Sequence, residues 1–228
     1  TSATSNTAMG DAALLSNNGG NNTAVGYDAL STNTTGAYNT GIGYGTEATT
    51  TSGNNNTAIG RTAGATVNNI SNTTALGYDA HPTATNMVRV GNTLVTSIGG
   101  QVGWTTVSDA RFKRNVRTDV KGLDFIMKLR PVTYNYDVNS LSSFLKEGLR
   151  TNDKGEVVRD EDPDAQAARD QQAANRYTGF LAQEVEAAAK SVDYDFSGVD
   201  APKTANSMYG MRYAEFVVPL VKAVQEQQ

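Results

Sequence analysis

Five short segments recur along the first third of the chain at an almost constant spacing. Each reads Thr, a small residue, an aliphatic residue and Gly, and together they are Thr7–Gly10, Thr23–Gly26, Thr40–Gly43, Thr57–Gly60 and Thr74–Gly77. Successive segments begin 16, 17, 17 and 17 residues apart. A disordered linker has no need of such register, and the period is too short for two helices. The sequence therefore predicts a β-solenoid of short strands and turns.

Each repeat places one aliphatic side chain at the same phase: Met9, Val25, Ile42, Ile59 and Leu76. One such side chain per coil gives little apolar surface, so a lone solenoid would be marginally stable. We therefore expect several chains side by side with these aliphatic residues buried on a common axis, most economically as a homotrimer.

The clearest repeats, Asn22–Gly26 and Asn56–Gly60, read Asn-Thr-Ala-aliphatic-Gly. This motif resembles the repeats of trimeric phage tail fibres and the head repeats of trimeric bacterial adhesins, over about residues 6–80. The connector, 81–107, alternates over 87–92 and 93–98, which predicts two further strands. Its Trp104, the sole tryptophan, is expected to anchor the core or the trimer axis.

Composition changes sharply near residues 105–110, which predicts two domains, 1–107 and 108–228. Six charged residues lie in the first part and 36 in the second, whereas 16 of the 22 glycines lie before residue 108. Each part carries a net charge of −2. This charge gives no reason to expect binding to nucleic acid or to an acidic membrane.

Several classes of site are excluded or disfavoured. With no cysteine and one histidine, the chain has no thiolate zinc site, disulfide or multi-histidine metal site, and we expect no cofactor. A Ser-His-Asp triad would need His81, which precedes a proline in a Thr-rich loop. The acidic run 160–164 is typical of a soluble loop, and the calcium-like start at Asp193 lacks a Glu at its twelfth position, Thr204. No apolar run is long enough for membrane insertion.

The second part predicts an α+β domain, so the fold class is mixed: an all-β solenoid followed by helices and strands. Helices are expected at 122–129 and 182–190 and strands at 132–137, 177–181 and 207–213, with a solvated, partly helical insertion at 138–175. The chain ends in a helix with an apolar stripe at a/d-like spacing, suited to a trimeric bundle: Val217, Leu220, Val221 and Val224. Pro219 must lie in its first turn or kink it.

A candidate nucleophile stands at the composition boundary. Lys113 lies five residues after Ser108. A neutral lysine can activate a serine as general base, but its pKa must first be lowered by a desolvated pocket or a neighbouring cation. A five-residue spacing brings the two side chains together only through a turn or bulge. From the residues alone, an ordinary charged surface strand is the favoured interpretation.

Four motifs in order carry a second resemblance: Ser108–Lys113, Gly122–Tyr134, Gly179–Val185 and Val218–Glu226. Together they resemble the C-terminal intramolecular chaperone, or auto-processing, domain of phage tailspikes, endosialidases and tail fibres. The resemblance implies a domain that trimerises, drives assembly of the β-structure before it and then cuts itself off.

Carried over by position, the resemblance makes Ser108 the nucleophile, Lys113 the base and Val107–Ser108 the scissile bond, with Asp109 and Arg111 supporting the turn. It implies a homotrimeric virion tail fibre or extracellular surface fibre with a self-cleaving serine peptidase. The alternative is a non-cleaving assembly module on a tip that binds a host receptor or glycan.

Overall fold

The computed structural model describes residues 4–47, 51–151, 157–159 and 164–228. The chain forms two compact units, the first made of residues up to 96 together with 135–175, and the second of 97–134 together with 176–228. The first unit therefore joins the solenoid to the insertion, whose role the sequence left open. The predicted domain boundary between residues 107 and 108 stays a prediction.

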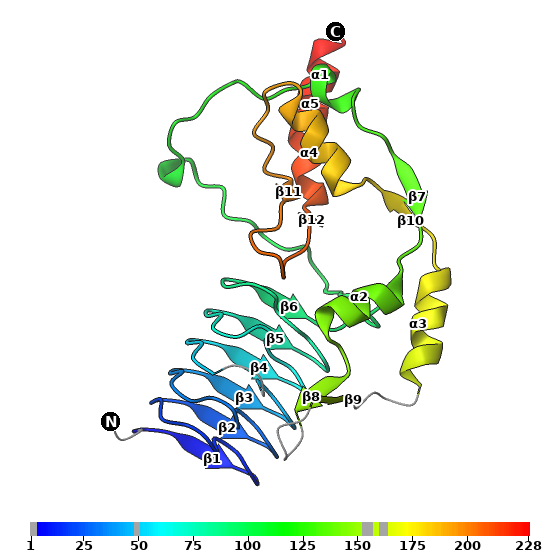
Figure 1. Ribbon diagram of the computed structural model, residues 1–228. Coiled ribbons are helices and arrows are strands. Elements are labelled where there is room, and N and C mark those ends of the chain that lie inside the picture. Colours follow the sequence, from blue (N-terminus) through cyan, green and yellow to red (C-terminus); the bar gives the residue numbers. More distant parts are fainter. Residues whose placement is uncertain (1–3, 48–50, 152–156, 160–163) are drawn as a thin grey trace. The chain divides into compact units, whose positions relative to one another are not determined.

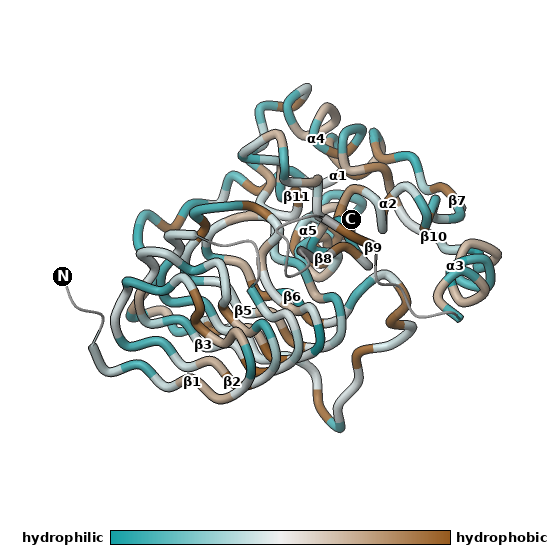
Figure 2. The backbone as a smooth tube through the Cα atoms, turned by 60° about the horizontal axis from the view of Figure 1, so that its bottom comes forward, coloured by the Kyte–Doolittle hydropathy of each residue, from teal (hydrophilic) through white to brown (hydrophobic). Residues whose placement is uncertain are grey.

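A parallel β-solenoid forms most of the first unit, as predicted (Figure 1). Its strands are β1 (Thr7–Met9), β2 (Thr23–Val25), β3 (Thr40–Ile42), β4 (Thr57–Ile59), β5 (Thr74–Leu76) and β6 (Val88–Val90). They pair in sequence order, and the first Thr of each repeat lies opposite the first Thr of the next. Strand β6 begins sooner than the repeat spacing would place it, because Thr74 pairs with Val88. In Figure 2 the coils stack behind one another and are mostly hydrophilic, with short hydrophobic stretches.

The small residue of each repeat, not the aliphatic one, faces the solenoid interior. Ala24, Ala58 and Ala75 are fully buried, because alternate residues of a strand point to opposite faces. The next residue in each repeat therefore points outward, and Ile42, for example, is 40% exposed. A single coil thus buries alanine and leaves its larger apolar side chain on the outer face.

Asparagine side chains link successive coils inside the solenoid. The Oδ1 atom of the Asn before each repeat accepts the backbone N–H of the equivalent residue one coil on, at 2.8–3.1 Å, in the pairs Asn6–Asn22, Asn22–Asn39, Asn39–Asn56 and Asn56–Thr73. The Nδ2 group of Asn39 also donates to the Gly53 carbonyl at 2.8 Å. These bonds pair polar backbone groups that burial would otherwise strip of water. They account for the Asn of the repeat motif.

The glycine that ends each repeat is required by backbone conformation and by crowding. At Gly43 φ is +132°, and a Cβ atom there would lie 2.6 Å from the carbonyl oxygen of Gly60. Any L side chain is strained at such a φ, and real contacts are never this short. The coils can therefore stack only with glycine at this corner.

The insertion contains two helices and a hairpin within the first unit: α2 (Val138–Leu145), β8 (Leu149–Thr151), β9 (Val157–Arg159) and α3 (Ala165–Ala174). Asp137 caps α2, because its side chain accepts the Ser140 N–H at 2.9 Å. The Arg169 side chain on α3 donates to the Asn139 Oδ1 atom on α2 at 3.1 Å. Most of the acidic run, 160–163, lies outside the described residues.

The second predicted strand of the connector, 93–98, is wrong. Strand β6 confirms the first one, but residues 93 and 94 form a turn and residues 95–98 form no strand. The Thr93 N–H and hydroxyl both donate to the Glu147 carboxylate, at 2.9 and 2.6 Å, so the backbone is not available to a neighbouring strand. Alternation in the sequence could not reveal a partner 54 residues away.

The second unit is the small α+β arrangement that the sequence predicts, with α1 (Leu123–Ile126), β7 (Val132–Tyr134), β10 (Tyr177–Gly179), α4 (Ala182–Lys190), β11 (Val199–Asp200), β12 (Gly210–Met211) and α5 (Val217–Glu226). Strands β7 and β10 pair antiparallel, as do β11 and β12. The strand expected at 207–213 is reduced to β12. Pro219 lies in the first turn of α5, as expected.

An aromatic core holds the second unit together. Phe125 of α1 is fully buried, and its ring lies 4.9 Å from that of Phe196, which in turn meets Phe216 edge-on at 4.8 Å. Val185 of α4 completes the cluster. Among the described residues, no helix is both long and apolar enough to cross a membrane.

Candidate functional site

The turn after residue 107 brings Ser108 and Lys113 together. The Lys113 Nζ group donates to the Ser108 Oγ atom at 2.8 Å, and both side chains are exposed. A 3-10 turn, η1 (Ala110–Phe112), reverses the chain between them and is the short green helix in the long loop of Figure 1. The sequence argument required such a turn. A nucleophile within hydrogen-bond reach of a base is the arrangement that nucleophilic catalysis needs.

Asp109 and Arg111 fix this turn. The Asp109 carboxylate accepts the Arg111 N–H at 2.9 Å, and its two oxygens take the guanidinium side-on, with one contact at 2.6 Å. Hydrogen bonds from the Arg111 side chain, and then from its backbone, hold the pKa of Asp109 below its ordinary value. The same pairing raises the pKa of Arg111. Together these contacts orient the backbone between serine and lysine.

Two arginines close to Lys113 in the sequence, Arg111 and Arg114, both have partners within the turn. The Arg111 guanidinium is paired with Asp109, so its charge is largely compensated where it lies. Arg114 donates through Nη1 to the Arg111 carbonyl at 2.8 Å and the Lys113 carbonyl at 3.2 Å. Both residues therefore support the turn more directly than they act on the Lys113 ammonium group.

Apolar side chains around the candidate bond are exposed in the single chain. Val107 is 82% exposed, and Trp104 is 93% exposed, so Trp104 is not a core residue of its own chain. Its expected place at a trimer axis stays a prediction. Phe112 and Val116 on the other side of Ser108 are exposed as well. Exposed apolar residues in such numbers are typical of a contact surface.

Helix α5 presents a second exposed apolar surface. All four residues of its predicted stripe are 46–58% exposed, namely Val217, Leu220, Val221 and Val224. The opposite side of the helix, with Pro219 and Ala223, is buried against its own unit. Apolar residues thus lie on both sides of α5, and only one of these sides is covered within the single chain.

The outward aliphatic residues of the solenoid form a third apolar surface. Met9, Ile42, Ile59 and Leu76 are 65%, 40%, 42% and 37% exposed, and the strand register stacks them in one column. The sequence predicted that this column packs against other chains. Its exposure in the single chain leaves the column free for that contact.

The sole histidine takes no part in a serine site. Its Nδ1 atom lies 2.7 Å from the Gly64 carbonyl oxygen and its Nε2 atom 2.9 Å from Asp79 Oδ1, and the ring is buried. Both ring nitrogens are thus occupied within the solenoid. Among the residues that the structure describes, no group of three His, Cys, Asp or Glu side chains is placed to hold a metal ion.

Sequence reasoning missed one cluster, where the insertion meets the solenoid through Asp79, Arg89 and Glu147. Its members are far apart in the sequence and belong to no common motif. The only signal was weak: isolated charged residues in a half that has few of them.

Residues 108–194 match the family described as chaperone of endosialidase, which is also named as a peptidase family. No curated protein and no solved structure matches the chain. The matched region begins at Ser108, after the solenoid and its connector, and confirms the family resemblance over the three motifs that lie within it. The fourth motif, Val218–Glu226, lies beyond the matched residues.

Proposed function

We propose, from the family match of residues 108–194, that this chain is the end of a trimeric fibre joined to a chaperone that cuts itself off. A chaperone of this family attached to a β-solenoid is consistent with a phage tail fibre or tailspike in a virion or extracellular fibre. The finer steps proposed are trimer assembly and one self-cleavage between Val107 and Ser108.

In the proposed reaction Lys113, as a neutral amine, takes the Ser108 hydroxyl proton while Oγ attacks the Val107 carbonyl carbon. The attack closes a small ring through the Ser108 Cβ and Cα atoms. The bond from the Val107 carbonyl carbon to the Ser108 nitrogen then breaks, and the protonated Lys113 gives its proton to that nitrogen. An ester between Val107 and the Ser108 side chain remains. Water hydrolyses the ester, which frees a carboxylate on Val107 and restores the Ser108 hydroxyl.

Trimerisation is the proposed condition for this reaction. The lysine must lose its proton, which needs a desolvated site, and in the single chain the Ser108–Lys113 pair is exposed. Three apolar side chains near it in the sequence, Trp104, Val107 and Phe112, are exposed in the single chain, and in the proposal other chains cover them. Covering them would exclude water from the pair and couple cleavage to assembly.

The chaperone role follows from the order of assembly. If the aliphatic columns of three solenoids pack together, the three chains must meet in the same register. Such contacts between distant residues form slowly. Trimerisation through the exposed stripe of α5 would hold three solenoids at a high effective concentration. Cleavage afterwards would remove the template and leave the fibre kinetically stable.

The Ser108–Lys113 hydrogen bond at the first residue of the family match is the observation that carries this proposal. Intact-mass measurement of the purified wild-type chain should show two fragments, the second beginning at Ser108 by N-terminal sequencing. Ser108→Ala and Lys113→Ala should leave a 24.1 kDa chain that still trimerises. Lys113→Arg should also fail, because a guanidinium stays protonated.

Matched controls are available in the same half. Ser143 lies in α2 and Lys128 in the turn after α1, and both are exposed, so Ser143→Ala and Lys128→Ala should cut as the wild type does. A wild-type chain that stays intact as a trimer would establish the non-cleaving assembly module instead. A Lys113→Ala chain that cuts at the wild-type rate would remove lysine from the mechanism.

A further inference from the structure

We propose that cutting the Val107–Ser108 bond does not by itself separate the two products, because residues 146–148 of the insertion remain bound to the solenoid. This inference rests on the proposed cleavage. The partner is the solenoid of the processed fibre, and the surface that binds it is the turn between α2 and β8, called here the 146–148 turn.

Glu147 is the centre of the contact. Its side chain is 3% exposed, and its carboxylate accepts the Thr93 N–H at 2.9 Å and the Thr93 hydroxyl at 2.6 Å. The Arg89 guanidinium of β6 lies 3.9 Å from the same carboxylate. Burial lowers the pKa of Arg89, while Glu147 acts in the opposite sense and favours the charged guanidinium. Two hydrogen bonds and one ion pair thus hold this buried carboxylate, and all three come from residues before the proposed cut.

The neighbouring residue binds a second buried carboxylate from the solenoid side. The Gly148 N–H donates to Asp79 Oδ2, whose other oxygen accepts the Thr62 hydroxyl at 3.1 Å and faces His81 Nε2 at 2.9 Å. Asp79 is 2% exposed. The insertion thus completes a polar cluster inside the solenoid, and its departure would leave Asp79 with one donor fewer.

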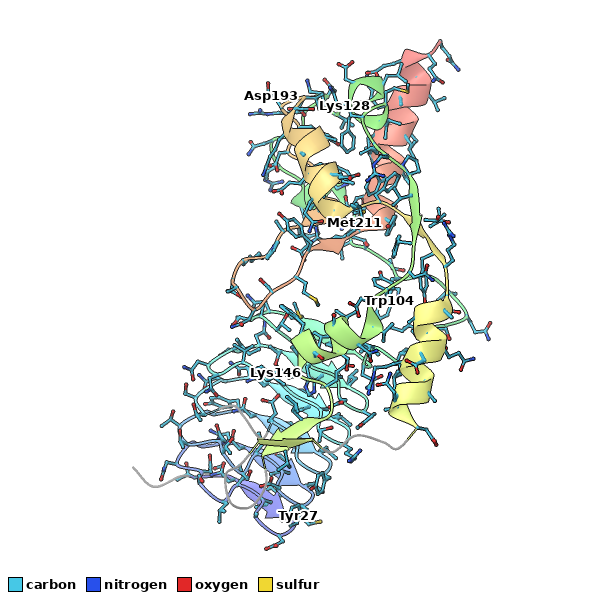
Figure 3. All side chains as sticks on the ribbon, turned by 45° about the vertical axis from the view of Figure 1, so that its right-hand side comes forward. Tyr27, Trp104, Lys128, Lys146, Asp193 and Met211 are labelled. Atoms are coloured by element: carbon cyan, nitrogen blue, oxygen red, sulfur yellow. The ribbon has the colours of Figure 1, made fainter. Side chains whose placement is uncertain are left out.

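The third contact and the backbone of the turn complete the geometry. The Lys146 Nζ group donates to the Thr66 carbonyl at 3.1 Å, and Figure 3 labels Lys146 beside the solenoid coils. Lys146 ends α2 in the left-handed conformation with φ of 59°, and Gly148 follows with φ of 74°. These two bends direct three consecutive residues toward the same surface, so little further ordering is needed to bind it.

The position of the cut decides the consequence. Every solenoid partner of the 146–148 turn lies before Val107, and the turn itself lies after Ser108, so no contact is severed by cleavage. Separation must instead rehydrate Glu147 and Asp79 and break charge-assisted hydrogen bonds, each of which is stronger than a neutral one. Release of the chaperone half therefore requires the turn to open as a second, separate event.

The test is to let the wild-type chain cut itself and then analyse the products by size-exclusion chromatography at neutral pH without denaturant. The two fragments should elute together, and Glu147→Ala should raise their apparent dissociation constant roughly 10- to 100-fold, so that they separate on the column. Lys146→Ala should weaken the complex less. Wild-type fragments that separate at once would overturn the inference.

Two further samples keep this result independent of folding and of self-cleavage. Glu184→Gln removes an exposed carboxylate that pairs with Arg130 in the other unit, so its fragments should stay together as in the wild type. A Ser108→Ala chain with a recognition sequence for a site-specific protease inserted after Gly103 can be cut from outside. Its fragments should also elute together, and if they separate, the inference fails whatever happens at Ser108.

Discussion

Replacing Asn39 by alanine should destabilise the solenoid strongly although it removes no apolar contact. Asn39 is 2% exposed, its Oδ1 atom accepts the Asn56 N–H at 2.9 Å, and its Nδ2 group donates to the Gly53 carbonyl at 2.8 Å. The substitution takes that partner away from two buried backbone groups, and an unsatisfied buried group costs about 1–3 kcal/mol. The free energy of unfolding should therefore fall by about 2–6 kcal/mol.

The measurement is thermal unfolding followed by circular dichroism, in a Ser108→Ala background so that all samples stay in one piece. For a domain of this size about 1 kcal/mol corresponds to roughly 2–4 °C, so Tm should fall by roughly 4–24 °C. Asn18→Ala is the control, because Asn18 is exposed and its side chain makes one long hydrogen bond among the described residues, to the Ser16 carbonyl at 3.5 Å. If Asn39→Ala and Asn18→Ala shift Tm equally, the ladder does not stabilise the coils as argued.

Three other predictions follow from the described contacts. Gly43→Ala should lower Tm or prevent soluble expression, whereas Gly103→Ala, where a Cβ would meet no atom within 4 Å, should not; equal behaviour would contradict the crowding argument. Leu220→Asp should give an uncut monomer by light scattering and intact mass, and efficient cutting by such a monomer would refute the coupling to assembly. Because Arg111 lowers the pKa of Asp109, the Asp109 carboxylate should stay ionised, and the turn intact, at pH values below the ordinary pKa of a carboxyl group. The turn should be lost only as the pH falls through that lowered pKa. Asp109→Asn should therefore slow cleavage at neutral pH, as measured by fragment accumulation over time.

Repeats and residue order were enough to predict the main elements, because each depends on local pattern. Five of the six solenoid strands, β1 to β5, coincide with the Thr-led repeats, and the helix expected at 182–190 is α4 with the same ends. The turn that joins Ser108 to Lys113 was required by their spacing and is present. Local periodicity carries this information because neighbouring residues decide it.

What the sequence did not show depends on contacts between distant residues. Thr93 is drawn from a strand into a turn by Glu147, and the two are 54 residues apart. The sequence also did not show which side chains of the repeat face the solenoid interior, because alternation along a three-residue strand does not say which face is inside. Alanine fills the interior because successive coils approach closely, as the contact between Gly43 and Gly60 shows.

The residues of each repeat fall into two sets: those that order the coils within one chain and one that is left for contact between chains. Asparagine and glycine fix the register of coils within one chain, through hydrogen bonds and close backbone contact that need no partner. The aliphatic residue is left on the outer face, where it cannot help its own chain to fold and is available only to another. A chain built this way can form its coils alone, but the order in which chains meet is not specified by those coils. In the proposed assembly an apolar helix such as α5, which comes after the solenoid in the sequence and is exposed on one side of its own unit, would supply that order from outside the repeat. A template that is removed afterwards would then be useful, because once the outer columns are buried against one another the helix has no further contact to provide.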